Sequence, residues 1–311
     1  MVYKGLVIKS TGNLYSIKNI ENKQIVTCTI RGKLRTKGIK STNPVAVGDI
    51  IEYYIPENSD VGVIKNIMDR KNYIVRKSTN LSKQSHILAA NIDQAILMIT
   101  IAFPETSPIF IDRFLISAEA YNIPAKLIFN KIDLYDEEQI AYMNQLIDIY
   151  QKVGYDCITT SIKSEINIDK IKDLIKDKIS VISGNSGVGK SSLINLIDPN
   201  LDLKTSEISE YHKSGKHTTT FAEMLELSLG GFIIDTPGVR GFGLYDIKKE
   251  ELFHYFPEIF KASENCKYNN CTHVHEPGCA ILEAIKKGDI SKLRYENYLN
   301  ILLSEDSKHR L

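Results

Sequence analysis

Residues 184–191 of this 311-residue chain carry the residue types that bind a nucleoside triphosphate. They match the pattern G-x-x-x-x-G-K-S, with an apolar run before them and a helical run after them. In this pattern, backbone N–H groups of the glycine-rich turn surround phosphate oxygens at a helix N-terminus. We expect Lys190 to pair with the β- and γ-phosphates and the Ser191 hydroxyl to bind Mg²⁺. The segment is therefore a predicted phosphate loop.

A second segment, Asn130-Lys131-Ile132-Asp133, indicates which base is bound. The Asp133 carboxylate can accept hydrogen bonds from N1–H and the exocyclic amine of guanine, whereas adenine presents neither pattern. We expect Lys131 to lie along the base plane and Asn130 to tie this guanine loop to the phosphate loop. Residues 160–163, which include Ser161 and Ile162, end the next predicted strand and are predicted to form a second guanine loop.

A third segment, Asp235-Thr236-Pro237-Gly238, follows an apolar run typical of a buried strand. We expect Asp235 to hold Mg²⁺ through water and the Gly238 N–H to sense the γ-phosphate. The next residue is Val239, where many GTPases carry a glutamine that orients the attacking water. The sequence therefore predicts slow intrinsic hydrolysis and a partner that completes the site.

Residues 215–220, Gly-Lys-His-Thr-Thr-Thr, are the predicted first switch, because they lie between the phosphate loop and the D-x-x-G segment. Thr219, or else Thr218, is expected to reach Mg²⁺. His217 could orient or deprotonate water, and the alternative is a structural or partner contact. The catalytic candidates are therefore Lys190, His217 and Thr219.

The order of these segments is rotated relative to an ordinary GTPase. There the phosphate loop comes first and N-K-x-D last, whereas here N-K-x-D comes first. The sequence therefore predicts a circularly permuted GTPase domain. The old termini would meet where a predicted helix at residues 170–177 precedes a predicted strand at residues 179–183. Whatever follows residue 243 is then attached directly to the second switch, which moves when the γ-phosphate is lost.

A group of metal-ligand residues follows residue 260. Its members are Cys266, Cys271, His273 and Cys279. Three thiolates and one imidazole make a closed tetrahedral set, which suits a structural Zn²⁺ rather than a catalytic ion. His275 is an alternative ligand, and a set of buried or disulfide-linked thiols is the alternative interpretation.

Five short strands are predicted before residue 75, separated by Gly, Asn, Asp and Pro. They cover residues 5–9, 14–18, 25–30, 49–55 and 62–67. This pattern favours an oligonucleotide-binding (OB) barrel over residues 1–75, with an SH3-like packing barrel as the alternative. Residues 31–40 form a basic loop with two glycines, where such a barrel could contact a phosphate backbone.

The formal net charge of +1 hides an asymmetry. Residues 1–80 hold 14 Lys and Arg against 6 Asp and Glu, a net charge of +8, so the remainder carries −7. The N-terminal region therefore suits a polyanion, and the alternative is a solvated face of a lysine-rich protein.

Residues 76–243 alternate predicted strands with helical segments, which indicates a mostly parallel sheet covered by helices. The strands are expected at residues 95–101, 126–129, 157–159, 180–183 and 232–234. Each binding motif follows one of them, at the strand end where open α/β sheets bind ligands. Residues 244–311 are expected to form a zinc-binding domain with helices at residues 280–287 and 290–303. The predicted fold class is thus multidomain α/β.

The composition is that of a globular protein, with 43% hydrophobic and 25% charged residues. No apolar run reaches the roughly 18 residues that span a membrane. The chain opens Met-Val-Tyr-Lys-Gly, without the pattern of a secretory signal. We therefore expect a cytoplasmic monomer that does not bind a membrane.

Together these features resemble the ribosome small-subunit-dependent GTPase A family, also called the RsgA or YjeQ family. The resemblance spans nearly the whole chain and rests on the barrel, the permuted motif order, K-H-T-T-T, D-T-P-G-V-R and C-x4-C-x-H-x5-C. It implies a protein that binds the 30S ribosomal subunit, with its 16S rRNA, late in maturation and hydrolyses GTP to GDP when the subunit stimulates it. Lys216 departs from the family's usual arginine and lacks its bidentate contacts.

The resemblance, together with the motifs, implies one set of site residues. The expected nucleotide contacts are Asn130, Lys131, Ile132, Asp133, Ser161, Ile162, Gly184, Asn185, Ser186, Gly187, Val188, Gly189, Lys190, Ser191, Ser192, Asp235 and Gly238. Mg²⁺ is expected on Ser191, Thr219 and Asp235, and one Zn²⁺ on Cys266, Cys271, His273 and Cys279.

Two other functions fit parts of the pattern. A GTP-dependent RNA-binding switch for another target, such as tRNA or mRNA, would hydrolyse GTP without acceleration by 30S subunits. A small-molecule P-loop kinase would phosphorylate an acceptor without RNA, but the guanine motif and D-T-P-G argue against it.

Overall fold

The computed structural model describes residues 1–31, 44–77, 85–203, 223–235 and 247–304. The chain divides into two compact units. The first contains Met1–Ile96, Ile168–Ser183 and Lys190–Arg240, and the second contains Leu97–Asn167, Gly184–Gly189 and Gly241–Leu311. The division into three domains at residues 75 and 243 stays a prediction.

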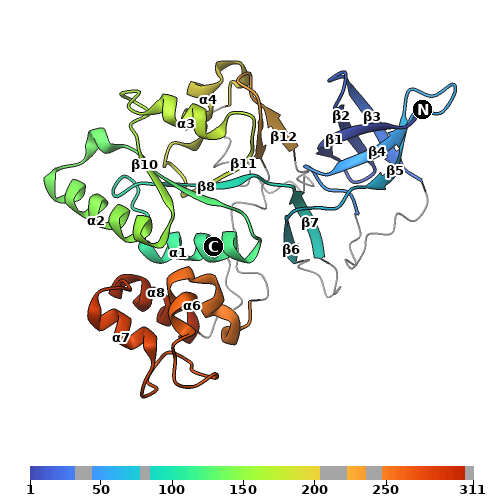
Figure 1. Ribbon diagram of the computed structural model, residues 1–311. Helices are drawn as coiled ribbons and strands as arrows, with labels where there is room; N and C mark the ends of the chain where they lie inside the picture. Colours follow the sequence, from blue (N-terminus) through green and yellow to red (C-terminus); the bar gives the residue numbers. More distant parts are fainter. Residues whose placement is uncertain (32–43, 78–84, 204–222, 236–246, 305–311) are drawn as a thin grey trace. The chain divides into compact units, whose positions relative to one another are not determined.

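Five strands at the start of the first unit form a closed barrel, drawn in shades of blue in Figure 1. They are β1 (Tyr3–Ser10), β2 (Leu14–Asn19), β3 (Ile25–Ile30), β4 (Ile50–Tyr54) and β5 (Gly62–Ile67). Their order is β1-β2-β3-β5-β4, and β4 pairs back with β1 to close the sheet. This is the five-stranded topology of an OB-fold, so that prediction is confirmed. The basic loop lies largely outside the described residues.

The barrel interior follows from alternation along its strands. In β2, Tyr15 and Ile17 are buried and the preceding Leu14 is exposed, because successive side chains point to opposite faces. The buried core of the barrel consists of Val7, Tyr15, Ile17, Cys28, Val45, Ile51, Tyr53 and Ile64. Cys28 is therefore a packing residue of the barrel.

A hairpin that the sequence did not predict follows the barrel. It pairs β6 (Tyr73–Lys77) with β7 (Ser85–Ala90) in antiparallel register. The intervening sequence, residues 78–84, has no two-residue turn signal such as Asn-Gly, so the hairpin left no local signature.

The other strands of the first unit follow the order β8-β11-β13-β12-β1. They are β8 (Gln94–Ile99), whose last three residues belong to the second unit, β11 (Ile179–Ser183), β12 (Glu223–Glu226) and β13 (Phe232–Asp235). β11 and β13 are parallel, and β12 is antiparallel to β13. Helices α3 (Ile168–Ile175) and α4 (Lys190–Ile197) precede and follow β11, and a 3-10 turn, η2, covers Pro199–Leu201.

In the second unit, the strand order is β10-β9-β8. β9 (Ala125–Phe129) and β10 (Asp156–Thr159) are parallel. Two helices, α1 (Pro108–Ala120) and α2 (Glu137–Val153), connect these strands, and a 3-10 turn, η1 (Ile132–Leu134), follows β9. α2 begins with a capping box, in which the side chains of Asp136 and Gln139 each accept from the other's backbone N–H.

The C-terminal helices also belong to the second unit and appear in orange and red in Figure 1. They are η3 (Lys249–Tyr255), α6 (Pro257–Ser263), α7 (Ala280–Lys287) and α8 (Lys292–Leu303). Their buried apolar cluster includes Phe256, Ile281, Tyr298 and also Ile116 of α1, so these helices pack on α1. Within the described ranges, no helix has the length and apolar character needed to cross a membrane.

A buried network of charges joins α8 to α1 and α6. The fully buried Arg294 donates from Nη1 to Asp112 Oδ1 at 2.5 Å and from Nε to Glu258 Oε1 at 2.7 Å. Asn297 Nδ2 and the Tyr150 hydroxyl also donate to the Asp112 carboxylate, at 2.6 Å and 3.1 Å. Each of the three charges therefore has a partner, which offsets much of the cost of its burial.

Replacing Arg294 by alanine would leave the buried Asp112 carboxylate without its cation. We expect Arg294→Ala to lower the free energy of unfolding by about 3–5 kcal/mol in a chemical denaturation experiment. Lys292→Ala, at the exposed start of the same helix, is the control and should change it by less than about 0.5 kcal/mol. Equal stability of the two variants would contradict a structural role for the network.

Candidate guanine-nucleotide site and metal centre

The Asn130 side chain joins three loops of the second unit. Asn130 directly follows β9 and is almost fully buried. Its Nδ2 donates to the Val188 carbonyl in the phosphate loop at 2.8 Å, and its Oδ1 accepts from the Ile162 N–H at 3.2 Å. One amide group thus fixes the guanine loop against both the phosphate loop and the second guanine loop.

Lys131 makes a further link from the guanine loop to the phosphate loop. Its backbone adopts a left-handed conformation, with φ of 68°, at the start of η1. Its Nζ donates to the Gly187 carbonyl at 2.8 Å and also to the Phe103 carbonyl. The ammonium group is thereby held by two backbone carbonyls, and the position of this side chain along the base plane stays a prediction.

The Asp133 carboxylate is held by the second guanine loop. Asp133 is exposed, and its Oδ1 accepts from the Ser161 hydroxyl at 2.6 Å. Ser161 is fully buried and its Oγ also accepts from the Ser164 N–H at 3.0 Å. A buried hydroxyl therefore orients an exposed carboxylate, which suits recognition of a base that presents two N–H donors.

Two glycines of the phosphate loop are required by close backbone approach. Gly184 has φ of 142°, and a Cβ there would lie 2.5 Å from the Met98 carbonyl oxygen. Gly189 has φ of 106°, and a Cβ there would lie 2.7 Å from Asn130 Nδ2. A larger residue at position 184 would push the phosphate loop away from β8, and one at position 189 would push it away from the guanine loop, so both positions need glycine.

Other predicted nucleotide residues lie where a helix or strand begins or ends, or fall outside the residues that the structure describes. α4 begins at Lys190, directly after the phosphate loop, and Ser191 in its first turn is buried. Asp235 is the last residue of β13. His217, Thr219 and Gly238 fall outside the described residues, so the roles assigned to them stay predictions.

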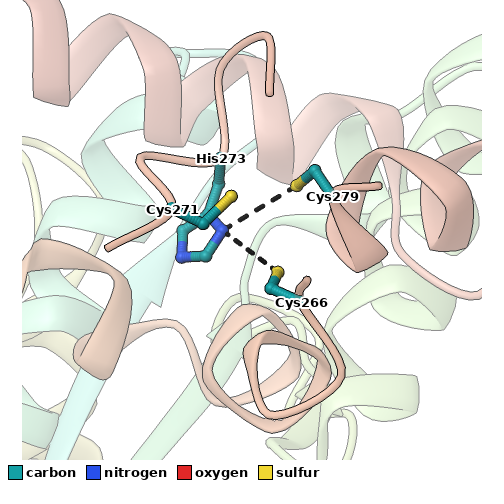
Figure 2. Close-up of side chains that lie close together, drawn as sticks. All are labelled: Cys266, Cys271, His273 and Cys279. Carbon is teal, nitrogen blue, oxygen red and sulfur yellow. Dashed lines mark hydrogen bonds between the residues drawn. The ribbon is translucent and has the colours of Figure 1, made fainter. Parts of the chain in front are cut away.

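The four predicted metal ligands gather at one point of the second unit (Figure 2). The potential ligand atoms of Cys266, Cys271, His273 and Cys279 all lie within 4.8 Å of one another. His273 Nδ1 lies 3.6 Å from Cys266 Sγ and 3.8 Å from Cys279 Sγ. The alternative ligand His275 is not a member of this group.

These distances fit a tetrahedral metal. With Zn–S near 2.3 Å and Zn–N near 2.0 Å, the sulfur–nitrogen edge of such a site is about 3.6 Å. All five cysteines are free, so disulfide-linked thiols do not explain the group. Burial raises the pKa of the Cys271 thiol to about 12, and a bound cation would have to displace such thiol protons.

Neighbouring residues fix the segment that carries the ligands. The Tyr295 hydroxyl of α8 donates to the His273 carbonyl at 2.7 Å. The Glu276 carboxylate accepts from the Thr272 and Val274 N–H groups, at 2.8 Å and 3.1 Å, and from the Thr272 hydroxyl. These bonds hold the pKa of Glu276 well below its usual range, with the Thr272 hydroxyl contributing most. Sequence patterns gave no sign of these supporting residues, because their donors and acceptors are mostly backbone groups.

The permuted arrangement of strands and motifs also occurs in known proteins. Two family models match the chain, the RsgA N-terminal domain over residues 4–64 and the RsgA GTPase over residues 67–245. A Bacteroides thetaiotaomicron protein named small ribosomal subunit biogenesis GTPase RsgA 2 is 55% identical over 308 residues, which cover 99% of each chain.

Two solved structures share the fold. The crystal structure of YjeQ from Thermotoga maritima has a TM-score of 0.80 and 37% identity, covering 97% of this chain and 98% of that one. YloQ, described as a circularly permuted GTPase, has a TM-score of 0.78 and 30% identity, covering 100% and 98%.

Fold and motif order therefore define a circularly permuted GTPase, as the sequence predicted. The matches extend over the barrel as well as the GTPase region. The chain belongs to the RsgA GTPase family.

Removing the Asn130 side chain tests its role in joining the three loops. We expect Asn130→Ala to weaken GDP binding by more than about tenfold, because two buried hydrogen bonds are lost and the guanine loop separates from the phosphate loop. Fluorescent GDP titration gives the dissociation constant. Asn167→Ala, which removes a bond to the Thr159 carbonyl, is the control, and an equal effect of both variants would contradict the role.

Removing one ligand tests the metal centre. We expect Cys279→Ala to lose the stoichiometric metal that elemental analysis finds in the wild-type protein, and to unfold at a lower temperature. Cys157→Ala, a half-buried thiol on β10, should keep the metal. Full metal content in Cys279→Ala would show that this group of side chains is not the metal site.

Proposed function

We propose that the protein is a GTPase of small ribosomal subunit biogenesis, which binds the 30S subunit and hydrolyses GTP when the subunit stimulates it. Its membership of the RsgA GTPase family supports this, since relatives with more than half of their residues identical carry the name small ribosomal subunit biogenesis GTPase. The observation that carries the nucleotide part is the Asn130 amide, which links the guanine loop to the phosphate loop.

In this proposal the motif residues act as they do in other GTPases. The two guanine loops select the base, and the phosphate loop, ending in Lys190 and Ser191, binds the phosphates and Mg²⁺. Asp235 and Thr219 complete the Mg²⁺ shell, and His217 positions the attacking water in place of the glutamine that Val239 replaces. The metal held by the three cysteines and His273 is Zn²⁺ with a structural role, because no ligand position stays open for a substrate.

The RNA contacts are assigned to the N-terminal barrel. OB-folds bind nucleic acids, and residues 1–80 carry a net charge of +8, with 14 basic and 6 acidic residues. Phosphate contacts of this kind release counterions, so the association should weaken as salt increases. We further propose that the protein acts as a monomer in the cytoplasm, with the barrel, the permuted GTPase domain and the zinc-binding domain dividing near residues 75 and 243.

Stimulation by ribosomal particles tests this function directly. We expect purified protein alone to hydrolyse GTP slowly, and 30S subunits to raise the rate at least tenfold, with less stimulation at higher salt. 50S subunits and 70S ribosomes are the controls, and Lys190→Ala shows the background of contaminating activity. Equal rates with and without 30S subunits would favour the alternative, a GTP-dependent switch that acts on another RNA.

A further inference from the structure

A loop that belongs to none of the GTPase motifs contacts both the guanine loop and the phosphate loop. It is the β8–α1 loop, residues 100–107. The Phe103 carbonyl accepts from Lys131 Nζ of the guanine loop. The Glu105 carbonyl accepts from Asn185 Nδ2 of the phosphate loop at 3.2 Å. Backbone carbonyls of the β8–α1 loop thus receive donors from two different nucleotide-binding segments.

Two buried threonines give the β8–α1 loop a defined shape. Thr100 and Thr106 are both almost fully buried. The Thr100 N–H donates to Thr106 Oγ1 at 3.2 Å, the Thr106 N–H donates to the Thr100 carbonyl at 2.8 Å, and the Thr100 hydroxyl donates to the Pro104 carbonyl. Between them Phe103 has φ of 58°, a conformation that a bulky residue adopts only when its surroundings require it. These bonds hold the loop in the shape that presents the Phe103 and Glu105 carbonyls.

Tyr135 connects the β8–α1 loop to the backbone of the guanine loop. Its side chain is buried, at 8% exposure, just after η1. The hydroxyl donates to the Asn130 carbonyl at 2.5 Å and accepts from the Ile101 N–H at 2.9 Å. The hydroxyl thus both donates and accepts a hydrogen bond, and its two partners lie in the guanine loop and the β8–α1 loop. Burial raises the pKa of this hydroxyl above its ordinary value.

We infer that Tyr135 is a positioning residue for guanine recognition, which sets the guanine loop by tying the Asn130 backbone to the β8–α1 loop. The inference rests on the proposed binding of guanine nucleotides. Asn130 is then fixed from two sides, because its side chain is held by Val188 and Ile162 and its carbonyl by Tyr135. Fixing Asn130 also fixes the position of Asp133, three residues further along the chain.

Removing the hydroxyl has a defined chemical consequence. Tyr135→Phe keeps the ring that fills the buried space but leaves the Asn130 carbonyl and the Ile101 N–H without this partner. Buried backbone groups without partners are costly, so the guanine loop must shift to satisfy them. A shift would weaken the contact of Asp133 with the exocyclic amine of guanine more than contacts to the phosphates.

Comparing GDP with inosine diphosphate measures this contact, since hypoxanthine lacks the exocyclic amine. We expect Tyr135→Phe to raise the dissociation constant for GDP about five- to tenfold and that for inosine diphosphate about two- to threefold, because hypoxanthine keeps only one of the two donors that Asp133 accepts from, so that base selectivity falls. Tyr155→Phe is the matched control, because Tyr155 is equally buried but donates to Glu119 at 2.9 Å. That control should keep the wild-type constants.

A second variant, near the other end of the β8–α1 loop, tests the same inference. Thr106→Val removes the oxygen that accepts from the Thr100 N–H and should also lower the selectivity between the two nucleotides, by about threefold. Unchanged GDP affinity in Tyr135→Phe would overturn the inference. An equal loss for GDP and inosine diphosphate would overturn it as well, because it would mean a general loss of structure. Failure of the wild-type protein to bind GDP would instead overturn the proposed function.

Discussion

The Asn130 amide is the interaction on which the nucleotide site depends. Its two partners, Ile162 and Val188, lie 32 and 58 residues further along the chain, so one side chain joins all three loops. Glycine at position 189 completes the arrangement, since any Cβ there would collide with the amide.

The permutation itself is compatible with ordinary sheet geometry. α3 ends at Ile175 and β11 begins at Ile179, so the termini of an unpermuted domain are joined by a short turn. Asp93 fixes the start of β11, with its carboxylate accepting from the Ile179 N–H at 2.7 Å and its own N–H donating to the Ile179 carbonyl at 2.9 Å. The new C-terminal region starts after the D-x-x-G segment, and its helices are attached to α1 through Arg294 and Asp112. A helix of the GTPase region and the metal-binding region thereby share one buried core.

Local patterns predicted the parts of this structure that have short-range causes. Turn residues between short segments located all five barrel strands, α7 has the predicted bounds, and residue chemistry identified the four members of the metal group. Interactions between distant residues left no such signal. Arg294 and Asp112 are 182 positions apart, and nothing in the sequence around Tyr135 marks it as different from an ordinary core tyrosine. The hairpin of β6 and β7 was missed because no turn signal separates its strands. β12 was missed although Gly230-Gly231 marks a turn after it, because four residues are too few to show a strand pattern.

We propose that the guanine loop reads the base through Asp133. Competition of GTP and xanthosine triphosphate for the wild-type protein and for Asp133→Asn tests it most directly. A carboxamide can donate to the second carbonyl of xanthine, whereas a carboxylate can only accept, so the substitution should invert the preference. We expect the wild-type protein to prefer GTP and the variant to prefer xanthosine triphosphate. Wild-type preference for GTP in Asp133→Asn would contradict it.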